Sequence, residues 1–375
     1  MFNMLRTRWL AVVLIMALAV LTVPVTAQTK TPIPLPLADD GPQNVGYRVF
    51  KLTDASRDGR EMSEIIWYPA IAPTNPTEKQ SNDARQMGWV DATSDMTGAP
   101  YPLIVFSHGA NQTAVDFATL EMSLVTHEFV VVGLDHPNDD SPLTFVNRPM
   151  DVLFVLEQLA ARNRSDFGGL IDTDHVGVMG DSFGAYTTLA VTGARIDPAW
   201  VGVQPAKPSD STFYDTDPHT QFSDWSWDAL SAYRAKFSPL LQSGELWPPY
   251  TDKRILATLM ISPCYVPWFG EHGLAAATVP SLIVGGTADD VCGYEPDAAY
   301  TFAHLGSHDH FLLTLIDQGH VPGQGWSVTT QLYTAFFGYY LQGHQTDAQY
   351  LTANFVNSFA AERKLGMAWG PYSAK

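Results

Sequence analysis

Short apolar runs alternate with helical stretches along the middle of the chain. Runs that are apolar throughout are typical of strands buried on both faces of a parallel sheet. They lie at 102–106, 129–134, 176–179, 255–261, 281–284 and 311–316, the last of them. Helical patterns occur between the runs, at 115–126 and 149–161. Strands that alternate with helices predict an α/β fold with a doubly wound, mainly parallel sheet.

The 375 residues are enough for one large α/β domain with insertions. We assign this domain to 45–345, after a Pro-rich extended leader at 28–44 and before a C-terminal segment at 346–375. Residues 196–254 interrupt the alternation and hold four tryptophans and several prolines. We expect them to form an inserted cap over a functional site. The alternative is a long helical excursion with ordinary core aromatic residues.

Ahead of the alternating region, two further strands are predicted at 45–53 and 62–68. The sequence Arg57-Asp58-Gly59 between them predicts a turn. Residues 70–100 are rich in Pro, Thr, Asn, Asp and Gly and predict a long loop.

One tight turn in this pattern carries chemistry. Gly180-Asp181-Ser182-Phe183-Gly184 reads G-x-S-x-G, follows the apolar run 176–179 and precedes a small apolar stretch that predicts a helix. A strand, a tight turn and a helix form a nucleophile elbow, in which the serine hydroxyl points out of a strained turn. The flanking glycines let two backbone segments approach the serine closely. The pattern therefore predicts Ser182 as a nucleophile.

A serine hydroxyl needs a base, and the base needs a carboxylate to orient it. In a chain with this elbow, the acid and then the histidine follow the serine, in loops after later strands. Asp289 lies just past the run 281–284, and His320 follows the run 311–316. We predict Asp289 as the acid and His320 as the base. Asp290 is the alternative acid, and a turn-forming aspartate that caps a helix is the structural alternative.

Two backbone N–H groups are expected to bind the oxyanion of an acyl-transfer intermediate. One belongs to Phe183, the residue after the predicted nucleophile. The other is expected in the loop Ser107-His108-Gly109-Ala110 after the run 102–106, with the N–H of Ala110 as the donor. We expect His108 to brace this loop.

The N-terminus is typical of a secretory signal peptide. Arg6 and Arg8 precede an apolar run that ends near residue 23, and Val25-Thr26-Ala27 matches a small-x-small cleavage site. We predict a signal peptide at 1–27 and a secreted or periplasmic mature protein without a stable membrane span. An uncleaved N-terminal anchor is the alternative.

The charge balance excludes some partners. The chain has 21 Lys and Arg against 39 Asp and Glu, a formal net charge of −18. Scattered acids and a negative balance disfavour nucleic acids and anionic membranes as partners. The acids are predicted to lie on a solvated surface.

The two cysteines, Cys264 and Cys292, are expected to pair in an exported protein, with two separately buried thiols as the alternative. Neither has metal-site spacing, and no phosphate or dinucleotide loop occurs. We therefore predict no metal and no cofactor.

Several segments together resemble bacterial α/β-hydrolases akin to the platelet-activating-factor acetylhydrolases, which include predicted dienelactone hydrolases. The resembling segments are Val45-Gly46-Tyr47-Arg48, Ile66-Trp67-Tyr68-Pro69-Ala70, Pro102 to Gly109, Leu134-Asp135-His136-Pro137, Asn147 to Val152, Gly180 to Gly184 and Gly285 to Asp289. They span about 45–325. The resemblance implies the α/β-hydrolase fold and ester hydrolysis through a Ser–Asp–His triad. The segments around Asp289 and His320 are also similar to bacterial cutinases, including polyester-degrading ones.

Two departures from these families matter. Dienelactone hydrolase proper uses a cysteine nucleophile, whereas this chain has Ser182. The acetylhydrolases place their acid after the preceding strand, where this chain reads Ser262-Pro263-Cys264. The acid is therefore expected at Asp289.

These features predict an exported serine carboxylesterase or lipase that acts on small or polymeric esters. A polyester hydrolase and an acetylhydrolase-like phospholipase are alternatives within the same chemistry. A peptidase with the same triad is a rival, although no propeller-sized extra domain is present. A non-catalytic binding protein on a hydrolase fold is a rival of another class.

Overall fold

The computed structural model describes residues 33–74, 88–137, 141–201, 224–238, 245–363 and 365–372. The chain divides into two units, Met1–Pro34 and Leu35–Lys375, and the described helices and strands belong to the second. The predicted signal peptide at 1–27 lies outside the described residues.

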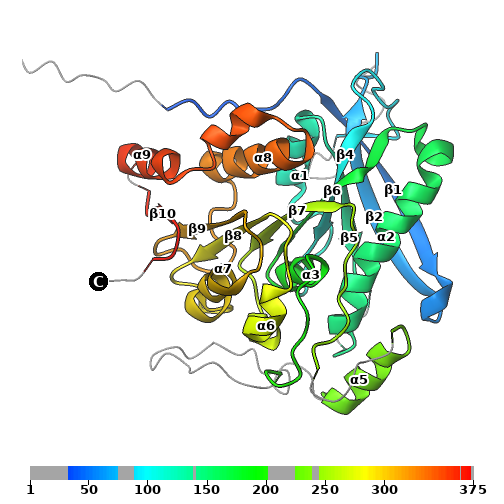
Figure 1. Cartoon of the computed structure of the whole chain (residues 1–375). Coiled ribbons are helices and arrows are strands. Elements are labelled where there is room, and N and C mark those ends of the chain that lie inside the picture. Colours follow the sequence, from blue (N-terminus) through cyan, green and yellow to red (C-terminus); the bar gives the residue numbers. More distant parts are fainter. Residues whose placement is uncertain are drawn as a thin grey trace, which may run out of the picture. The chain divides into compact units, whose positions relative to one another are not determined.

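The described strands form one ten-stranded sheet in the order β10-β9-β8-β7-β6-β4-β5-β2-β1-β3 (Figure 1). The six strands from β9 to β5 in this order run parallel, whereas β2 and β10 pair antiparallel at either side of them. The mostly parallel α/β sheet that the apolar runs predict is confirmed. The strands are β1 (Asn44–Asp54), β2 (Arg60–Ala70), β3 (Trp89–Val90), β4 (Tyr101–Ser107), β5 (Val130–Asp135), β6 (Ile171–Asp181), β7 (Ile255–Ile261), β8 (Ser281–Gly286), β9 (His310–Leu315) and β10 (Met367–Trp369).

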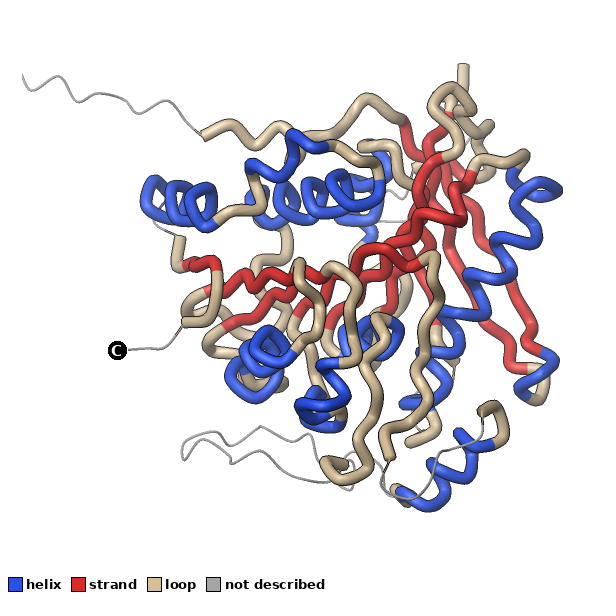
Figure 2. The backbone as a smooth tube through the Cα atoms, in the orientation of Figure 1, coloured by secondary structure: helices blue, strands red, loops and turns tan. Residues whose placement is uncertain are grey.

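Helices cover both faces of the sheet (Figure 2). Helices α1 and α8 pack on one face, and α2 and α3 pack on the other, where α6 and α7 also lie (Figure 1). The helices are α1 (Ala118–Thr126), α2 (Thr144–Phe167), α3 (Phe183–Val191), α5 (Trp227–Ala235), α6 (Gly270–Ala275), α7 (Tyr300–His304), α8 (Ser327–Leu341) and α9 (Ala353–Arg363). Short helical turns lie at Ala55–Arg57 (η1), Val266–Trp268 (η3), Tyr294–Ala299 (η4) and Gln345–Gln349 (η5).

The central strands show why their sequences are apolar throughout. Leu103, Ile104 and Val105 of β4 are consecutive and therefore point to alternating faces, yet all three are fully buried. Burial on both faces requires apolar side chains at every position, which is the pattern of a covered parallel sheet.

Helix α2 is longer than the predicted 149–161, because it begins before its proline. Pro149 lies inside the helix and has no N–H for the carbonyl of Phe145, one turn back. The hydroxyl of Tyr186 on α3 donates to that carbonyl at 3.0 Å instead. The helix ends at Gly168, which adopts φ 66°. A neighbouring helix therefore satisfies the backbone group that a proline normally leaves without a donor.

The run at 311–316 was predicted to form the last strand, and this prediction is wrong. A later strand, β10, pairs antiparallel with β9. Between them lie α8 and α9, which the apolar runs did not identify. The described part of the segment 346–375 thus adds a strand to the same sheet.

The region predicted as a cap is described only in part, since 202–223 and 239–244 lie outside the described residues. Trp247 and Tyr250 are buried in the core, and the ring of Trp225 contacts that of Trp268. The described part therefore packs against the domain, and a cap over the site stays a prediction.

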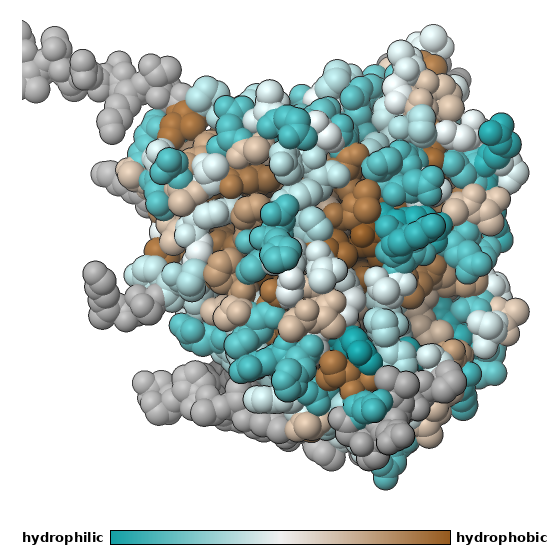
Figure 3. Space-filling model, in the orientation of Figure 1, coloured by the Kyte–Doolittle hydropathy of each residue, from teal (hydrophilic) through white to brown (hydrophobic). Residues whose placement is uncertain are grey.

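The surface mixes residue types. Hydrophobic residues reach the face shown in Figure 3 in separate patches between hydrophilic ones. Within the described ranges, no helix combines the length and the apolar character needed to cross a bilayer.

Several acids are buried, although the sequence predicts scattered acids on a solvated surface. Glu64 on β2 and Glu121 on α1 are fully buried, and their carboxylate oxygens have no hydrogen-bond partner among the described residues. Burial, with smaller effects from Asp151 and Asp135, raises the pKa of Glu64 to about 8. Burial also raises the pKa of Glu121. Burial therefore favours the neutral form of both side chains, and Glu64 is expected to be protonated in the folded protein at pH 7.

We predict that Glu64→Gln stabilises the protein increasingly as the pH rises from 5 to 8. Between about pH 4.5 and 8 the folded protein keeps a proton on Glu64 that the unfolded chain has released. This group therefore lowers the free energy of unfolding by about 1.4 kcal/mol per pH unit in that window. Glutamine is neutral at every pH and removes the dependence. Urea unfolding of both proteins at pH 5 and pH 8 measures it, and a difference that stays constant with pH would contradict the prediction.

Candidate functional site

The predicted site residues gather at one edge of the sheet. Ser182 follows β6, Asp289 follows β8 and His320 follows β9. These strands are parallel, so their carboxyl ends meet at the same edge, where open α/β sheets bind ligands.

Ser182 adopts a strained backbone conformation, with φ 53° and ψ −118°. It lies between the last residue of β6 and the first residue of α3. Close packing explains the glycines around it: a Cβ on Gly184 would overlap the carbonyl of Ser107, and one on Gly180 would overlap the carbonyl of Gly184. Ser182 is buried, with 9% of its surface exposed. This is the geometry that a nucleophile elbow requires.

His320 and Asp289 form a hydrogen-bonded pair. His320 Nδ1 lies 2.9 Å from Asp289 Oδ2 and 3.1 Å from Oδ1. The Asp289 side chain is 1% exposed and that of His320 is 21% exposed. Asp289 Oδ1 also accepts the N–H groups of Val291 and Cys292, each at 2.9 Å. Asp290 is exposed, so Asp289 is the aspartate that orients the imidazole.

A disulfide between Cys264 and Cys292 lies beside both Ser182 and His320. Ser182 Oγ is 3.6 Å from Cys264 Sγ, and the two sulfurs and a ring nitrogen of His320 all lie within 4.8 Å of one another. The structure gives no direct hydrogen bond between Ser182 Oγ and His320. Catalytic hydrogen bonds are often long without substrate and tighten when it binds.

The same three groups are the one cluster with metal-ligand proximity among the described residues. Both sulfurs are joined in the disulfide and are therefore not thiolates that bind a metal ion.

The loop that carries His320 is held by a residue that the sequence did not single out for this role. Ser262, directly after β7, accepts the N–H of Val321 at 3.1 Å through its hydroxyl. Val321 has a φ of 54°, which is unusual for a β-branched residue. The local sequence could not reveal this contact, because Ser262 and Val321 are 59 positions apart and meet only in the folded chain.

In the loop after β4, the N–H groups of Gly109 and Ala110 differ in their partners. Gly109 N–H donates to Gln112 Oε1 at 2.8 Å and to Asp181 Oδ1 at 3.0 Å. Ala110 N–H has no acceptor within the described part of the chain. Phe183 is the first residue of α3, where helical N–H groups have no acceptor one turn back. The two predicted oxyanion donors are therefore both available.

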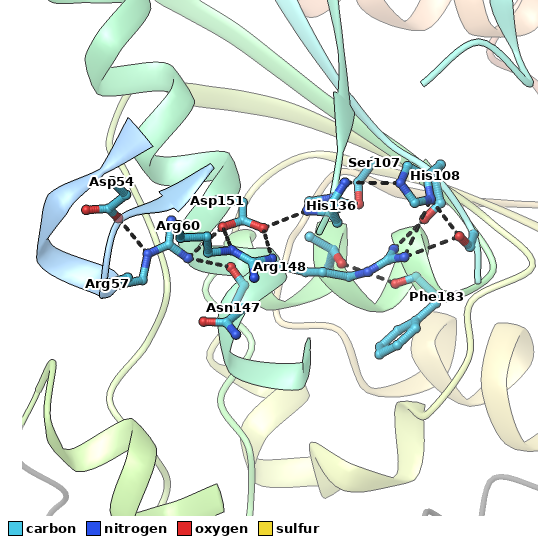
Figure 4. Close-up of polar contacts among 12 residues, drawn as sticks. Asp54, Arg57, Arg60, Ser107, His108, His136, Asn147, Arg148, Asp151 and Phe183 are labelled. Atoms are coloured by element: carbon cyan, nitrogen blue, oxygen red, sulfur yellow. Dashed lines mark hydrogen bonds and ion pairs between the residues drawn. The ribbon is translucent and has the colours of Figure 1, made fainter. Parts of the chain in front are cut away.

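A second serine–histidine–aspartate arrangement lies next to this loop (Figure 4). Ser107 Oγ is 2.9 Å from His136 Nε2, and His136 Nδ1 is 2.9 Å from Asp151 Oδ2. All three side chains are buried. The sequence did not predict it, because the base and the acid were expected among the residues that follow Ser182, whereas His136 and Asp151 precede it. His108 braces the loop as expected, since its Nε2 accepts the N–H of His136 at 3.2 Å.

Charge distinguishes this second arrangement. Two guanidinium groups, of Arg57 and Arg60, bind the Asp151 carboxylate at 2.6 to 2.9 Å. Burial raises the pKa of Asp151, but the hydrogen bonds from His136 and Arg60 outweigh it and hold this pKa below its usual range. The carboxylate is therefore neutralised by arginines, which is typical of a structural ion network.

Asp181, next to the predicted nucleophile, has the opposite shift. Burial raises its pKa to about 7, although the Gly109 amide, Gln112, His320 and Arg148 act against that. Its Oδ2 has no hydrogen-bond partner among the described residues.

A scan against models of known protein families finds no match, and a search of curated proteins finds no similar sequence.

We predict that replacing both cysteines, in Cys264→Ser/Cys292→Ser, lowers the free energy of unfolding by roughly 3–4 kcal/mol. The disulfide closes a loop of 28 residues, and cross-linking restricts the unfolded chain. Urea unfolding of the variant measures the loss, and wild-type protein reduced with dithiothreitol should unfold at the same urea concentration as the variant. A variant as stable as the oxidised wild type would contradict the prediction.

Proposed function

We propose that this chain is a serine hydrolase of the α/β-hydrolase fold that cleaves carboxylic esters. The observation that carries the proposal is the meeting of three features at one sheet edge. Ser182 occupies a strained strand-to-helix turn, the His320–Asp289 pair reaches the disulfide that Ser182 also contacts, and the loop after β4, where the N–H of Ala110 has no acceptor among the described residues, packs against the turn.

Acylation begins when Ser182 Oγ attacks the ester carbonyl carbon. The hydroxyl proton passes to His320 Nε2 while the Oγ–C bond forms, and the carbonyl π electrons move to the oxygen. The Asp289 carboxylate accepts the Nδ1–H of His320 and stabilises the imidazolium. The N–H groups of Phe183 and Ala110 bind the oxyanion. The oxyanion then collapses, the bond to the alkoxy oxygen breaks, and that oxygen takes the proton from His320.

Deacylation repeats these steps with water. His320 Nε2 takes a proton from the water as its oxygen bonds to the acyl carbon, and the second oxyanion uses the same two N–H groups. Collapse breaks the bond to Ser182 Oγ, which recovers its proton from His320 and leaves a carboxylic acid. No cofactor is needed for this balance.

Ser107 is a poor alternative nucleophile despite its hydrogen bond to a histidine. It is fully buried at the end of β4, so a substrate has no access to its hydroxyl. Its aspartate already binds two arginines and has less capacity to stabilise an imidazolium. Ser182 lies at the turn and is 9% exposed, whereas Ser107 has no exposed surface.

Export belongs to the same proposal. The predicted signal peptide at 1–27 and the negative charge favour a secreted or periplasmic enzyme that acts on small-molecule or polymeric esters.

We predict that Ser182→Ala lowers the rate of p-nitrophenyl ester hydrolysis by roughly 10⁴-fold or more, because no nucleophile remains to form the acyl-enzyme. Ser107→Ala is the matched control, since it removes the other histidine-bonded serine hydroxyl. It should keep at least about a tenth of the wild-type kcat, because neutral hydrogen bonds contribute on the order of 1 kcal/mol. Release of p-nitrophenol from short and long acyl esters measures both.

Three outcomes would overturn the proposal. If Ser107→Ala abolishes activity and Ser182→Ala does not, the nucleophile is Ser107. Hydrolysis of peptide bonds alone would identify a peptidase. No turnover of any ester by the wild type would favour a binding protein.

A further inference from the structure

One buried arginine holds the loop that carries the second predicted oxyanion donor. Arg148 on α2 is fully buried, and its guanidinium donates to two successive carbonyls, those of His108 and Gly109, the latter at 3.2 Å (Figure 4). The same guanidinium lies 4.7 Å from the centre of the Phe183 ring. Phe183 provides the other predicted donor, so Arg148 contacts both sides of the proposed oxyanion site.

The planarity of the peptide group turns this contact into a constraint on Ala110. The Gly109 carbonyl and the Ala110 N–H belong to one peptide group, and in a trans peptide they point in opposite directions. The only cis bond in the described chain is Ala99-Pro100, so this peptide is trans. The carbonyl of Gly109 is bound by Arg148 and, at 2.7 Å, by Nδ1 of His108. Donors that fix this carbonyl therefore also fix the direction of the Ala110 N–H.

The preceding peptide group is held at both ends. Arg148 binds its carbonyl, from His108, and Asp181 Oδ1 accepts its N–H, from Gly109. The Gly109 N–H is thus occupied, and the Ala110 N–H is left to face a ligand. Two planar groups in a row with fixed ends leave this loop little freedom to rotate.

We propose that Arg148 is a positioning residue that orients the Ala110 N–H as an oxyanion donor by holding the carbonyl of the same peptide group. This inference rests on the proposed ester hydrolysis. Arg148 acts through the backbone and does not touch the substrate. Its planar fork binds two carbonyls at once, which the single ammonium of a lysine does not reproduce.

Arg148→Lys tests the proposal in the full chain. We expect kcat to fall about 10- to 100-fold with KM within about threefold, because only transition-state binding is lost. Affinity for a trifluoromethyl ketone, which forms a tetrahedral adduct with a serine, should fall by the same factor as kcat/KM.

Arg195→Lys is the matched control. Arg195 also binds two successive carbonyls, of Leu246 and Trp247, but lies beyond the end of α3 that is remote from Ser182. It should leave kcat and ketone affinity unchanged. Equal kcat and ketone affinity in Arg148→Lys and wild type would overturn the role of Arg148.

A measurement on the wild type covers the case in which Arg148→Lys does not fold. In protein labelled with ¹⁵N-alanine, adduct formation should move the Ala110 amide proton downfield more than any other alanine amide. The Ala110 peak is identified by its absence from an Ala110→Ser sample. An Ala110 peak that stays in place while the adduct forms overturns the proposal.

Mass spectrometry of a covalent phosphonate adduct separates this inference from the proposed function. No adduct on Ser182 overturns the proposed function and this inference with it. An adduct on Ser182 without a shift at Ala110 overturns the positioning role alone.

Discussion

The close approach of α3 to the end of β4 is the constraint on which the rest of the site depends. Gly184 lies so near the carbonyl of Ser107 that a Cβ there would overlap it. This contact sets the distance between the turn of Ser182 and the loop from Ser107 to Ala110. Two elements of the proposed chemistry, a nucleophile and an N–H donor, are therefore placed by backbone packing, and a larger residue at 184 would separate them.

Close packing also buries charged and polar side chains away from water. The protein accommodates these side chains in two ways. Around α2, buried charged groups are hydrogen-bonded: Asp151 binds two arginines and His136, and Arg148 donates to two backbone carbonyls. Glu64 and Glu121 have no such partners, and burial raises the pKa of both, which favours their neutral forms. Hydrogen bonds within a buried network make it rigid, whereas unpartnered acids cost stability. The bonded network is the one that supports the loop after β4.

The sequence predicted the central sheet well because its parallel strands must be apolar at every position. It was less successful wherever a distant residue decides the local structure. Pro149 predicted a helix start, because proline has no N–H to donate to a carbonyl one turn back. The hydroxyl of Tyr186 donates to the carbonyl of Phe145 instead, so α2 begins earlier. The strand β10 is an edge strand of only three residues, Met367 to Trp369, and three apolar residues are too few to predict a strand.

The same division applies to the candidate site. The order of residues along the chain predicted Asp289 and His320 as an acid and a base, and the two side chains are hydrogen-bonded in the structure. Nothing local distinguishes Arg148 from a surface arginine on a helix. Its role depends on the carbonyls of His108 and Gly109, some 40 residues earlier. Contacts of this kind are set by the fold and leave no pattern in neighbouring residues.

The two serine–histidine–aspartate arrangements show that hydrogen-bond geometry alone does not rank candidate nucleophiles. Ser107, His136 and Asp151 have the more complete set of hydrogen bonds, but a buried hydroxyl with an arginine-bound acid behaves as part of the scaffold. Ser182 lacks a direct bond to His320, yet it lies at a strained turn next to the N–H of Phe183, and its helix packs against the loop after β4. Strain, access and donors that face an open position are the features that chemistry at a carbonyl needs. On these criteria the arrangement of Ser107, His136 and Asp151 has a structural role. It supports the proposed site because His136 hydrogen-bonds to Ser107 and His108 at the end of β4.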